Sequence, residues 1–433
     1  MENLKNINEE LLSFLYESPT PHYAVKTIKE ELVKENFTEL FEKDKWELKA
    51  HSKYFLTKNG TSILAFETGD TNVQDFGFTL IGAHTDAPCF KIKPNPEMIV
   101  KDHYLKLNTE GYGGALLGTW FDRPLSLAGE VFFETSNGLK SKLLNIQKPI
   151  MIIPSLAIHQ NREANKGFEI NKQNHTLPLL TFVNETLEKD NFLLKVIAKE
   201  LDIDETSIID FDLFLYDNQK GNLVGYEEDM ISSARLDDLW MCFTGLKGLL
   251  NSTDTSKTKV LLCVDNEEVG SKTAQGGDSA FLLNILKRIT LGLGQLSEED
   301  FLRAIVNSQM ISADSGHAFH PNFAEKCDPT SPTFPNKGMI IKYTAGARYA
   351  TSGQIASEII TLANKYDIPV QKYIDRSDAL GGSTIGPMMS SRLTIPVCDM
   401  GMSMLAMHSI RELGGAKDTV YSIDLFNKFF SVK

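Results

Sequence analysis

The sequence predicts an α/β fold in which a central, mostly parallel sheet carries helices on both faces. After Ser233, helical and strand-like segments alternate along the chain, which is the pattern of parallel strands joined by helical crossovers. Between residues 88 and 232, short strand-like segments and turns dominate instead. We therefore expect an α/β domain in two parts, residues 1–87 and 233–433, interrupted by a β-rich domain at 88–232.

The first part of the expected α/β domain begins with two helices within residues 1–35, separated by Ser18-Pro19-Thr20-Pro21. A hairpin is expected at Lys58-Asn59-Gly60, because Asn-Gly accepts the positive φ angles of a tight turn. The strands expected here are 53–57, 61–66 and 76–81. The last of them leads directly into His84.

In the β-rich part, a strand is expected at 127–134 and a helix at 192–201. The second half then alternates between the two types of element. We expect helices at 236–250, 280–290 and 355–365, and strands at 260–264, 305–313, 340–343 and 395–398. In open α/β sheets the ligand lies at the carboxyl ends of the parallel strands, and several polar motifs of this chain follow predicted strands.

The composition excludes several classes of protein. Hydrophobic residues make up 42% of the 433-residue chain and charged residues 23%, as in globular proteins, and no apolar run approaches the ~20 residues that span a bilayer. The net charge of −13 argues against nucleic-acid binding. The N-terminus has no secretory pattern and the five cysteines are scattered singly, so we expect free thiols and a cytoplasmic location.

The segment from Lys259 to Gly270 is the most informative in the chain. Its apolar run ends in an acidic stretch that contains the adjacent pair Glu267 and Glu268. Neighbouring side chains of an extended segment point in different directions. One carboxylate is therefore suited to hold a metal ion and the other to move a proton, although an isolated Glu-Glu pair is usually a solvated edge.

Two further motifs supply ligand types for a metal. His84 follows a predicted strand, and Asp86, two residues later, lies on the same side of an extended chain, where it can orient the imidazole. Asp237 and Asp238 lie at a predicted helix start, where capping or the helix dipole explains an aspartate equally well.

The remaining candidates lie in the last third of the chain. Asp314 ends a predicted strand and is followed by His317 and His320, which suits either a metal site or a structural turn. His408 lies in an apolar segment, where a core histidine is the alternative. Taken in order, His, Asp, Glu-Glu, Asp and His can build a site for two metal ions roughly 3.5–4 Å apart that share a bridging carboxylate.

These motifs resemble those of the aspartyl aminopeptidase (M18) family of metallo-aminopeptidases, and the resemblance runs from Ser18 to the C-terminus. The motifs that carry it are Gly82–Asp86, Thr119–Arg123, Leu156–His159, Arg235–Asp238, Asn266–Ser271, Ser312–Asp314, Ser383–Pro387 and Leu405–Glu412. The resemblance implies a zinc-peptidase (phosphorylase/hydrolase-like) catalytic domain interrupted by a dimerisation or lid domain. It also implies a homo-oligomer, the tetrahedral dodecamer built from dimers.

By this resemblance, each subunit binds two divalent ions, zinc by default, with cobalt or manganese as alternatives. The implied metal ligands are His84, Asp237, Glu268, Asp314 and His408, with Asp237 bridging the two ions. The implied catalytic residues are Glu267 as general base, Asp86 as the partner of His84, and His159, which reaches the active site of a neighbouring subunit. His317 and Lys342 are implied to line the substrate pocket.

The resemblance therefore implies an aminopeptidase that hydrolyses the N-terminal residue from peptides with a free amino terminus, through a metal-bridging water activated by Glu267. Lys342 would favour acidic first residues, Asp or Glu, although a lysine at a strand end can equally extend its ammonium into solvent. A preference for neutral residues such as leucine is the alternative. A dinuclear deacylase or carboxypeptidase would use Arg348 or Arg376 to bind a free carboxylate, and a non-enzymatic shell protein would have lost a ligand or the base.

Overall fold

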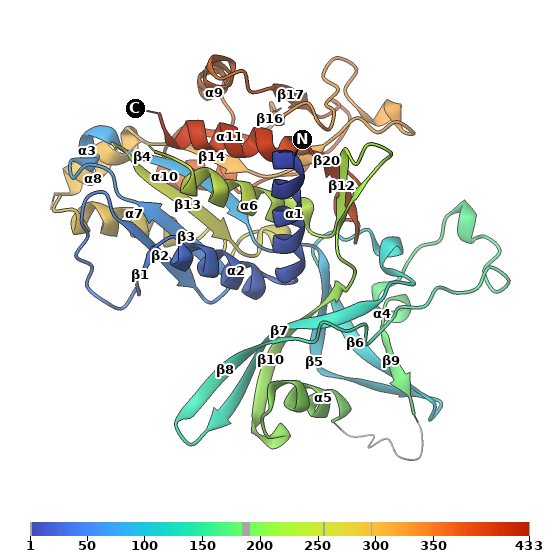
Figure 1. Cartoon of the computed structure of the whole chain (residues 1–433). Coiled ribbons are helices and arrows are strands. Elements are labelled where there is room, and N and C mark those ends of the chain that lie inside the picture. The colour runs from blue at the N-terminus through green and yellow to red at the C-terminus, as the bar shows by residue number, and fades with distance from the viewer. Residues whose placement is uncertain (1, 184–190, 254–255, 296, 433) are drawn as a thin grey trace. The chain divides into compact units, whose positions relative to one another are not determined.

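The computed structural model describes residues 2–183, 191–253, 256–295 and 297–432, and the backbone divides into two compact units (Figure 1). Unit 1 contains Met1–Asp86, Gly221–Met407 and Glu412–Lys433, and unit 2 contains Ala87–Lys220 and His408–Arg411. Unit 1 is thus built from segments on both sides of a long insertion. In the described residues, no helix is both long and apolar enough to cross a membrane.

The centre of unit 1 is a mixed sheet, which in the described residues has nine strands. Their spatial order is β1 (Thr38–Glu39), β2 (Lys53–Lys58), β3 (Ser62–Glu67), β13 (Thr258–Val264), β4 (Phe78–His84), β14 (Gln309–Ala313), β18 (Val397–Gly401), β16 (Met339–Tyr343) and β17 (Val370–Ile374). The four central strands β13, β4, β14 and β18 are parallel neighbours. The predicted α/β class with a mostly parallel sheet is confirmed.

Helices cover both faces of this sheet because successive strand side chains point in opposite directions. On β13, Leu261 and Cys263 join the core with α1, α2, α6, α9 and α11, whereas Val260 and Leu262 join the core with α7, α8 and α10. The helices are α1 (Glu2–Glu17), α2 (Pro21–Lys34), α3 (Val73–Phe76), α6 (Leu236–Leu250), α7 (Phe281–Gly292), α8 (Glu298–Val306), α9 (Gly353–Lys365), α10 (Gly386–Leu393) and α11 (Asp418–Phe430), with the 3-10 turn η5 (Ala324–Lys326). Figure 1 shows α7 and α11 along this sheet.

One predicted strand of unit 1 is partly wrong. The expected strand 305–313 contains the end of helix α8, and only β14 is extended. The side chain of Ser297 accepts a hydrogen bond from the backbone N–H of Asp300 at 3.1 Å, and the first turn of α8 is acidic. A cap of this kind and acidic residues near the N-terminus favour a helix, so the apolar end of α8 is helical rather than extended.

Unit 1 contains a second sheet, which has five strands in the part of the chain described. Three segments that are distant from one another in the sequence form it. Its order is β11 (Asn222–Val224), β12 (Met230–Ser233), β20 (Glu412–Gly415), β19 (Ser403–Leu405) and β15 (Gly316–His317). Residues 221–232, which we assigned to the insertion, thus contain β11 and most of β12, and β12 pairs with β20 near the C-terminus. Such a long-range pairing leaves no local signal in the sequence.

Unit 2 is built around an antiparallel sheet, six-stranded in its described residues. The order is β8 (Gly138–Asn145), β7 (Leu125–Thr135), β10 (Ile208–Asp217), β5 (Cys89–Val100), β6 (Tyr104–Tyr112) and β9 (Leu179–Phe182). Helix α5 (Phe192–Leu201) packs Leu193 and Ile197 into its core. The other elements are α4 (Lys172–His175), η1 (Leu117–Trp120), η2 (Ala164–Lys166) and η3 (Glu205–Ser207).

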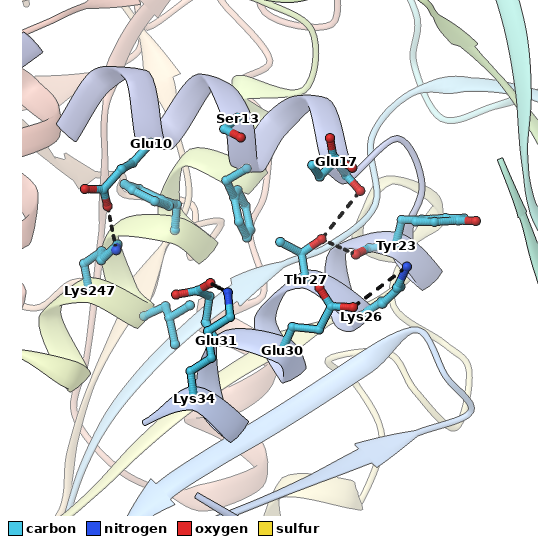
Figure 2. A pocket seen from close by; sticks show the side chains of 13 residues that line it. Glu10, Ser13, Glu17, Tyr23, Lys26, Thr27, Glu30, Glu31, Lys34 and Lys247 are labelled. Atoms are coloured by element: carbon cyan, nitrogen blue, oxygen red, sulfur yellow. Dashed lines mark hydrogen bonds and ion pairs between the residues drawn. The ribbon is translucent and has the colours of Figure 1, made fainter. Parts of the chain in front are cut away.

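A groove of about 400 Å³ in unit 1 is lined by α1, α2 and α6 (Figure 2). Most of its charged side chains are paired with one another. The ion pairs are Glu10–Lys247 at 2.7 Å, Lys34–Glu31 at 2.6 Å and Lys26–Glu30 at 3.8 Å. Pairs of this exposed kind contribute little to stability, and their mutual neutralisation leaves the groove with little charge to attract a ligand.

Candidate active site

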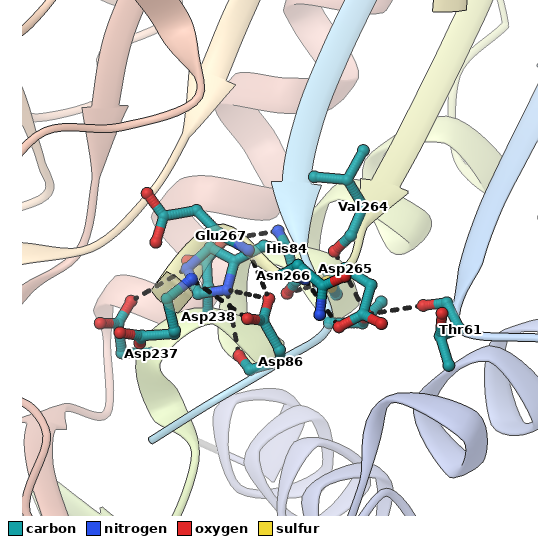
Figure 3. Close-up of polar contacts among 12 residues, drawn as sticks. Thr61, His84, Asp86, Asp237, Asp238, Val264, Asp265, Asn266 and Glu267 are labelled. Atoms are coloured by element: carbon teal, nitrogen blue, oxygen red, sulfur yellow. Dashed lines mark hydrogen bonds and ion pairs between the residues drawn. The ribbon is translucent and has the colours of Figure 1, made fainter. Parts of the chain in front are cut away.

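The candidate site lies at the carboxyl ends of three neighbouring parallel strands of unit 1. Strand β4 ends at His84, β13 ends at Val264, and β14 ends at Ala313, next to Asp314. Residues more than 200 positions apart in the sequence therefore meet at one edge of the sheet. Figure 3 shows the side chains of His84, Asp237 and Glu267 in this region.

His84 is buried, and both of its ring nitrogens face carboxylates. Its Nδ1 lies 3.3 Å from Asp86 Oδ1 and 3.0 Å from the Asp86 carbonyl oxygen, and its Nε2 lies 3.7 Å from Asp237 Oδ1. The two carboxylate oxygens of Asp86 also accept hydrogen bonds from the backbone N–H groups of Glu267 and Glu268, each at 3.1 Å. Asp86 thus connects the imidazole to the pair of glutamates and fixes the orientation of both.

We expected the glutamate pair to lie in an extended segment. It lies instead in the 3-10 turn η4 (Glu267–Val269). The strand stops at Val264, and Asn266 adopts a left-handed conformation with φ of 63°. Asparagine tolerates this conformation better than most residues. Ligand atoms of Glu267, Glu268 and His84 all lie within 4.8 Å of one another.

Asp237 and Asp238 lie at the start of α6, where both have non-helical backbone angles. The backbone N–H of Asp237 donates to Glu412 Oε2 at 2.9 Å, and Asp238 Oδ2 accepts from the backbone N–H of His84 at 3.1 Å. Ligand atoms of the two aspartates and His84 lie within 4.8 Å of one another. The predicted ligand Asp237 is therefore beside His84, together with Asp238, to which we had assigned no role.

The burial of these acidic groups perturbs their protonation. Burial, together with nearby carboxylates such as Asp314, raises the pKa of Glu267 to about 8, against the opposing effect of His84. Burial likewise raises the pKa of Asp238 well above its usual range. Burial lowers the pKa of His84, but the charges of Asp238 and Asp86 outweigh this effect, so the net shift is upward.

Asp314 and Lys342 form a buried ion pair. The ammonium of Lys342 donates to Asp314 Oδ1 at 2.7 Å and to the carbonyl oxygen of Ser315 at 2.6 Å, and its side chain is 3% exposed. Burial lowers the pKa of Lys342, but the charge of Asp314, the hydrogen bond to it and the charges of nearby groups such as Asp399 together outweigh this effect, so the net shift is upward. The lysine does not extend into solvent, and its charge is directed at a predicted metal ligand.

The remaining predicted site residues are His317, His408 and His159. His317 lines a hollow of about 470 Å³ in unit 1, together with His320, Tyr373 and Arg376. His408 is half-buried in unit 2, where its Nδ1 lies 3.2 Å from the carbonyl oxygen of Gly114. His159 lies in an exposed turn of unit 2.

The clustered residues of unit 1 fit a divalent metal ion. Asp238 Oδ1 is buried and, among the described residues, has no hydrogen-bond partner. Buried carboxylates are costly unless a cation compensates them, and imidazole with carboxylates is a ligand set that zinc accepts. Asp314 is outside the two groups formed around His84, but its charge raises the pKa values of both Asp238 and Glu267, so it lies near them.

Two residues of this site had no predicted role. Glu412 is buried and holds the backbone of Asp237, and Asp238 holds the backbone of His84. Both occur within motifs that carry the family resemblance, Arg235–Asp238 and Leu405–Glu412. Their roles depend on hydrogen bonds between distant segments, which spacing in the sequence does not reveal.

The sequence and the fold of the chain are similar to those of known proteins. Residues 14–430 match the sequence profile of the aminopeptidase I zinc metalloprotease (M18) family. The chain is 51% identical to a probable M18 family aminopeptidase 2 of Clostridium novyi over 100% of both chains, and 42% identical to that of Ectopseudomonas mendocina over 97% of both. Ape4, in the cryo-EM structure of the Ape4 and Nbr1 complex, matches with a TM-score of 0.96 and 35% identity over 99% of this chain and 86% of that one. The S. cerevisiae mApe1 dodecamer matches with a TM-score of 0.87 and 28% identity over 99% and 97%.

Proposed function

The chain belongs to the M18 family of zinc metallo-aminopeptidases, and from this premise we propose that it removes single N-terminal residues from peptides at the cluster around His84. The observation that carries the proposal is the meeting of His84, Asp237 and Glu268 with the partly buried Glu267 at the carboxyl edge of the sheet. The class of enzyme, a metallo-aminopeptidase, follows from the family.

We propose that two divalent ions bind each subunit, zinc by default. The residues that would hold them are the ligands implied by the family resemblance: His84, Asp237, Glu268, Asp314 and His408. When bound, such ions lower the pKa of a water molecule and polarise the scissile carbonyl. Asp86 would keep the imidazole of His84 oriented through Nδ1 and leave Nε2 for a metal.

Glu267 would accept the proton of the attacking water and pass it to the leaving amine. Its carboxyl group suits this role because it lies in the cluster with His84 and because its backbone N–H is fixed on Asp86. His159 of a neighbouring subunit would stabilise the oxyanion that develops on the carbonyl. In this scheme the first residue of the peptide, held by its free amino group, is the one removed.

We propose that the side chain of this first residue enters the hollow beside His317 and that acidic side chains are preferred. One basic residue of the hollow, the exposed Lys326, would attract them, whereas Arg376 is paired with Asp378 and the ammonium of Lys342 is bound by Asp314. At low salt, Asp- and Glu-anilides are expected to show a several-fold higher kcat/KM than Leu-anilide. This difference in kcat/KM should shrink at high salt, because salt screens the charge of an exposed side chain.

The variant that tests this prediction is Lys326→Gln, which should lower kcat/KM for acidic substrates and spare the leucine substrate. A preference for leucine that is insensitive to salt would rule out the cationic hollow. That neutral preference is the second candidate, favoured by the apolar side chains of Leu380, Met404 and Leu405 in the same hollow.

A deacylase or carboxypeptidase is less well supported by the arginines that we considered for it. Arg376 is bound by Asp378 through Nε and Nη2 at 2.9 and 2.8 Å, and Arg348 donates to the carbonyl oxygen of Gly381. Both guanidinium groups thus already have partners within the chain.

We propose that the protein is a cytoplasmic homo-oligomer, and that it forms the tetrahedral dodecamer from dimers that use the β-rich unit. The dodecameric state of the similar mApe1 supports the proposal. Light scattering coupled to size-exclusion chromatography should give a mass about twelve times that of the 48.3 kDa chain. If the assembly brings His159 to a neighbouring site, His159→Ala should lower kcat without changing this mass. A monomeric and fully active enzyme would contradict the proposal.

A further inference from the structure

The position of Lys342 has a consequence that the proposed function does not use. Lys342 lies on β16, which is separated from β14 by β18. Its side chain nevertheless reaches Asp314, the residue that follows β14. Gly316 makes room for it, because a Cβ atom at this position would lie 3.2 Å from Lys342 Cε and 2.5 Å from Ile340 Cδ1. The lysine is therefore built into the floor of the site.

We propose that Lys342 is a positioning residue that acts on the zinc ligand Asp314, lowering the affinity of the site for zinc while raising the rate of hydrolysis. This inference rests on the proposed function, in which Asp314 binds a metal. The ammonium occupies Oδ1 of Asp314 and leaves the other oxygen of the carboxylate for an ion.

The argument for weaker zinc binding is electrostatic. An ammonium and a divalent ion on one buried carboxylate repel each other, and in a poorly solvated environment this repulsion is strong. Coupling of this kind is reciprocal, so each cation weakens the binding of the other. Lys342 is almost fully buried and also donates to the carbonyl oxygen of Ser315, so it cannot simply turn away into solvent.

The argument for faster hydrolysis concerns the charge that Asp314 can donate. A carboxylate that shares its charge with an ammonium donates less electron density to a bound ion, which remains a stronger Lewis acid towards the substrate carbonyl. The salt bridge also restricts the rotation of Asp314, so the carboxylate is oriented before the metal arrives. Neither effect depends on the side chain of the substrate.

The test compares Lys342→Met with Lys342→Arg at pH 8. The matched control is Lys372→Met, which makes the same change at an exposed position of the neighbouring strand β17. Zinc affinity is measured by competition with a chromogenic chelator, and kcat and KM are measured with Asp- and Leu-anilides. Circular dichroism of each variant establishes that it is folded.

For Lys342→Met, we expect zinc to bind about tenfold more tightly or better, because one positive charge has been removed from a ligand carboxylate. We also expect kcat to fall by the same factor for both substrates, with little change in KM. Lys342→Arg should retain most of the wild-type behaviour, and Lys372→Met should retain all of it.

Three other outcomes would overturn the inference. A loss confined to the Asp-anilide, with unchanged zinc affinity, would make Lys342 a specificity residue. A loss of both zinc affinity and activity in Lys342→Met would show a merely structural role. Unchanged zinc affinity and activity in that variant would show no role at all. A wild-type protein that neither binds zinc nor hydrolyses peptides would instead refute the proposed function, so the two failures are distinguishable.

Discussion

Replacing Glu267 by glutamine is expected to lower kcat by about 10²–10⁴-fold, the contribution typical of a general base, while the zinc content of the protein stays unchanged. The substitution removes the group that accepts a proton from water but preserves the shape of the side chain. The backbone N–H of residue 267 can still donate to Asp86, so the turn should remain in place. Steady-state kinetics and elemental analysis of the same preparation measure both quantities.

The adjacent residue provides a matched control. Glu268→Gln makes the same chemical change one position along the chain, but at a proposed metal ligand, so it should lower the zinc content as well as the activity. A Glu267→Gln variant with near-normal turnover would remove the proton-transfer role from Glu267. Equal loss of zinc in both variants would contradict the separate roles that we propose, metal binding for Glu268 and proton transfer for Glu267.

Removing the metal with a chelator is expected to reduce hydrolysis to background, and adding zinc back should restore it fully at two equivalents per chain. The cluster around His84 contains buried carboxylates that only a cation can compensate at close range. The metal-free protein should also unfold at a lower temperature, because zinc binds the folded state selectively.

Glu267→Gln serves as the control for metal stoichiometry, since it should take up the same two equivalents without regaining activity. Full recovery of the wild type at one equivalent would show a mononuclear enzyme. Activity that survives exhaustive chelation would contradict the metal-dependent mechanism altogether.

Much of the fold could be predicted because its signals are local. The alternation of elements after Ser233 predicted the parallel sheet, and the Asn59-Gly60 turn predicted the hairpin of β2 and β3. The predictions of secondary and domain structure were less accurate where contacts between distant segments determine the structure. Strand β12 pairs with β20, about 180 residues later, and nothing near β12 in the sequence indicates that partner.

The candidate site could likewise be predicted only where its signals are local in the sequence. The order of His84, Asp237, Glu267, Glu268 and Asp314 at element ends predicted that acidic and imidazole groups would lie at one edge of the sheet. Four of them meet in the clusters around His84, and Asp314 lies nearby.

The partners of these residues could not be predicted, since they are set by tertiary packing. The contact of Lys342 with Asp314 joins residues on β16 and just after β14, and no sequence spacing indicates it. Glu412 was part of a recognised motif, but its contact with the backbone of Asp237 depends on the register of β12 and β20.

The order of strands in the central sheet also determines when the site can form during synthesis. Strand β4, which carries His84, lies between β13 and β14, both of which are encoded after the long insertion. A nascent chain that stops before Asp314 thus has the histidine but lacks β16, β17 and β18 and two proposed ligands, Asp314 and His408. Such distant pairings form slowly, and we therefore expect peptide hydrolysis only from chains that are close to full length.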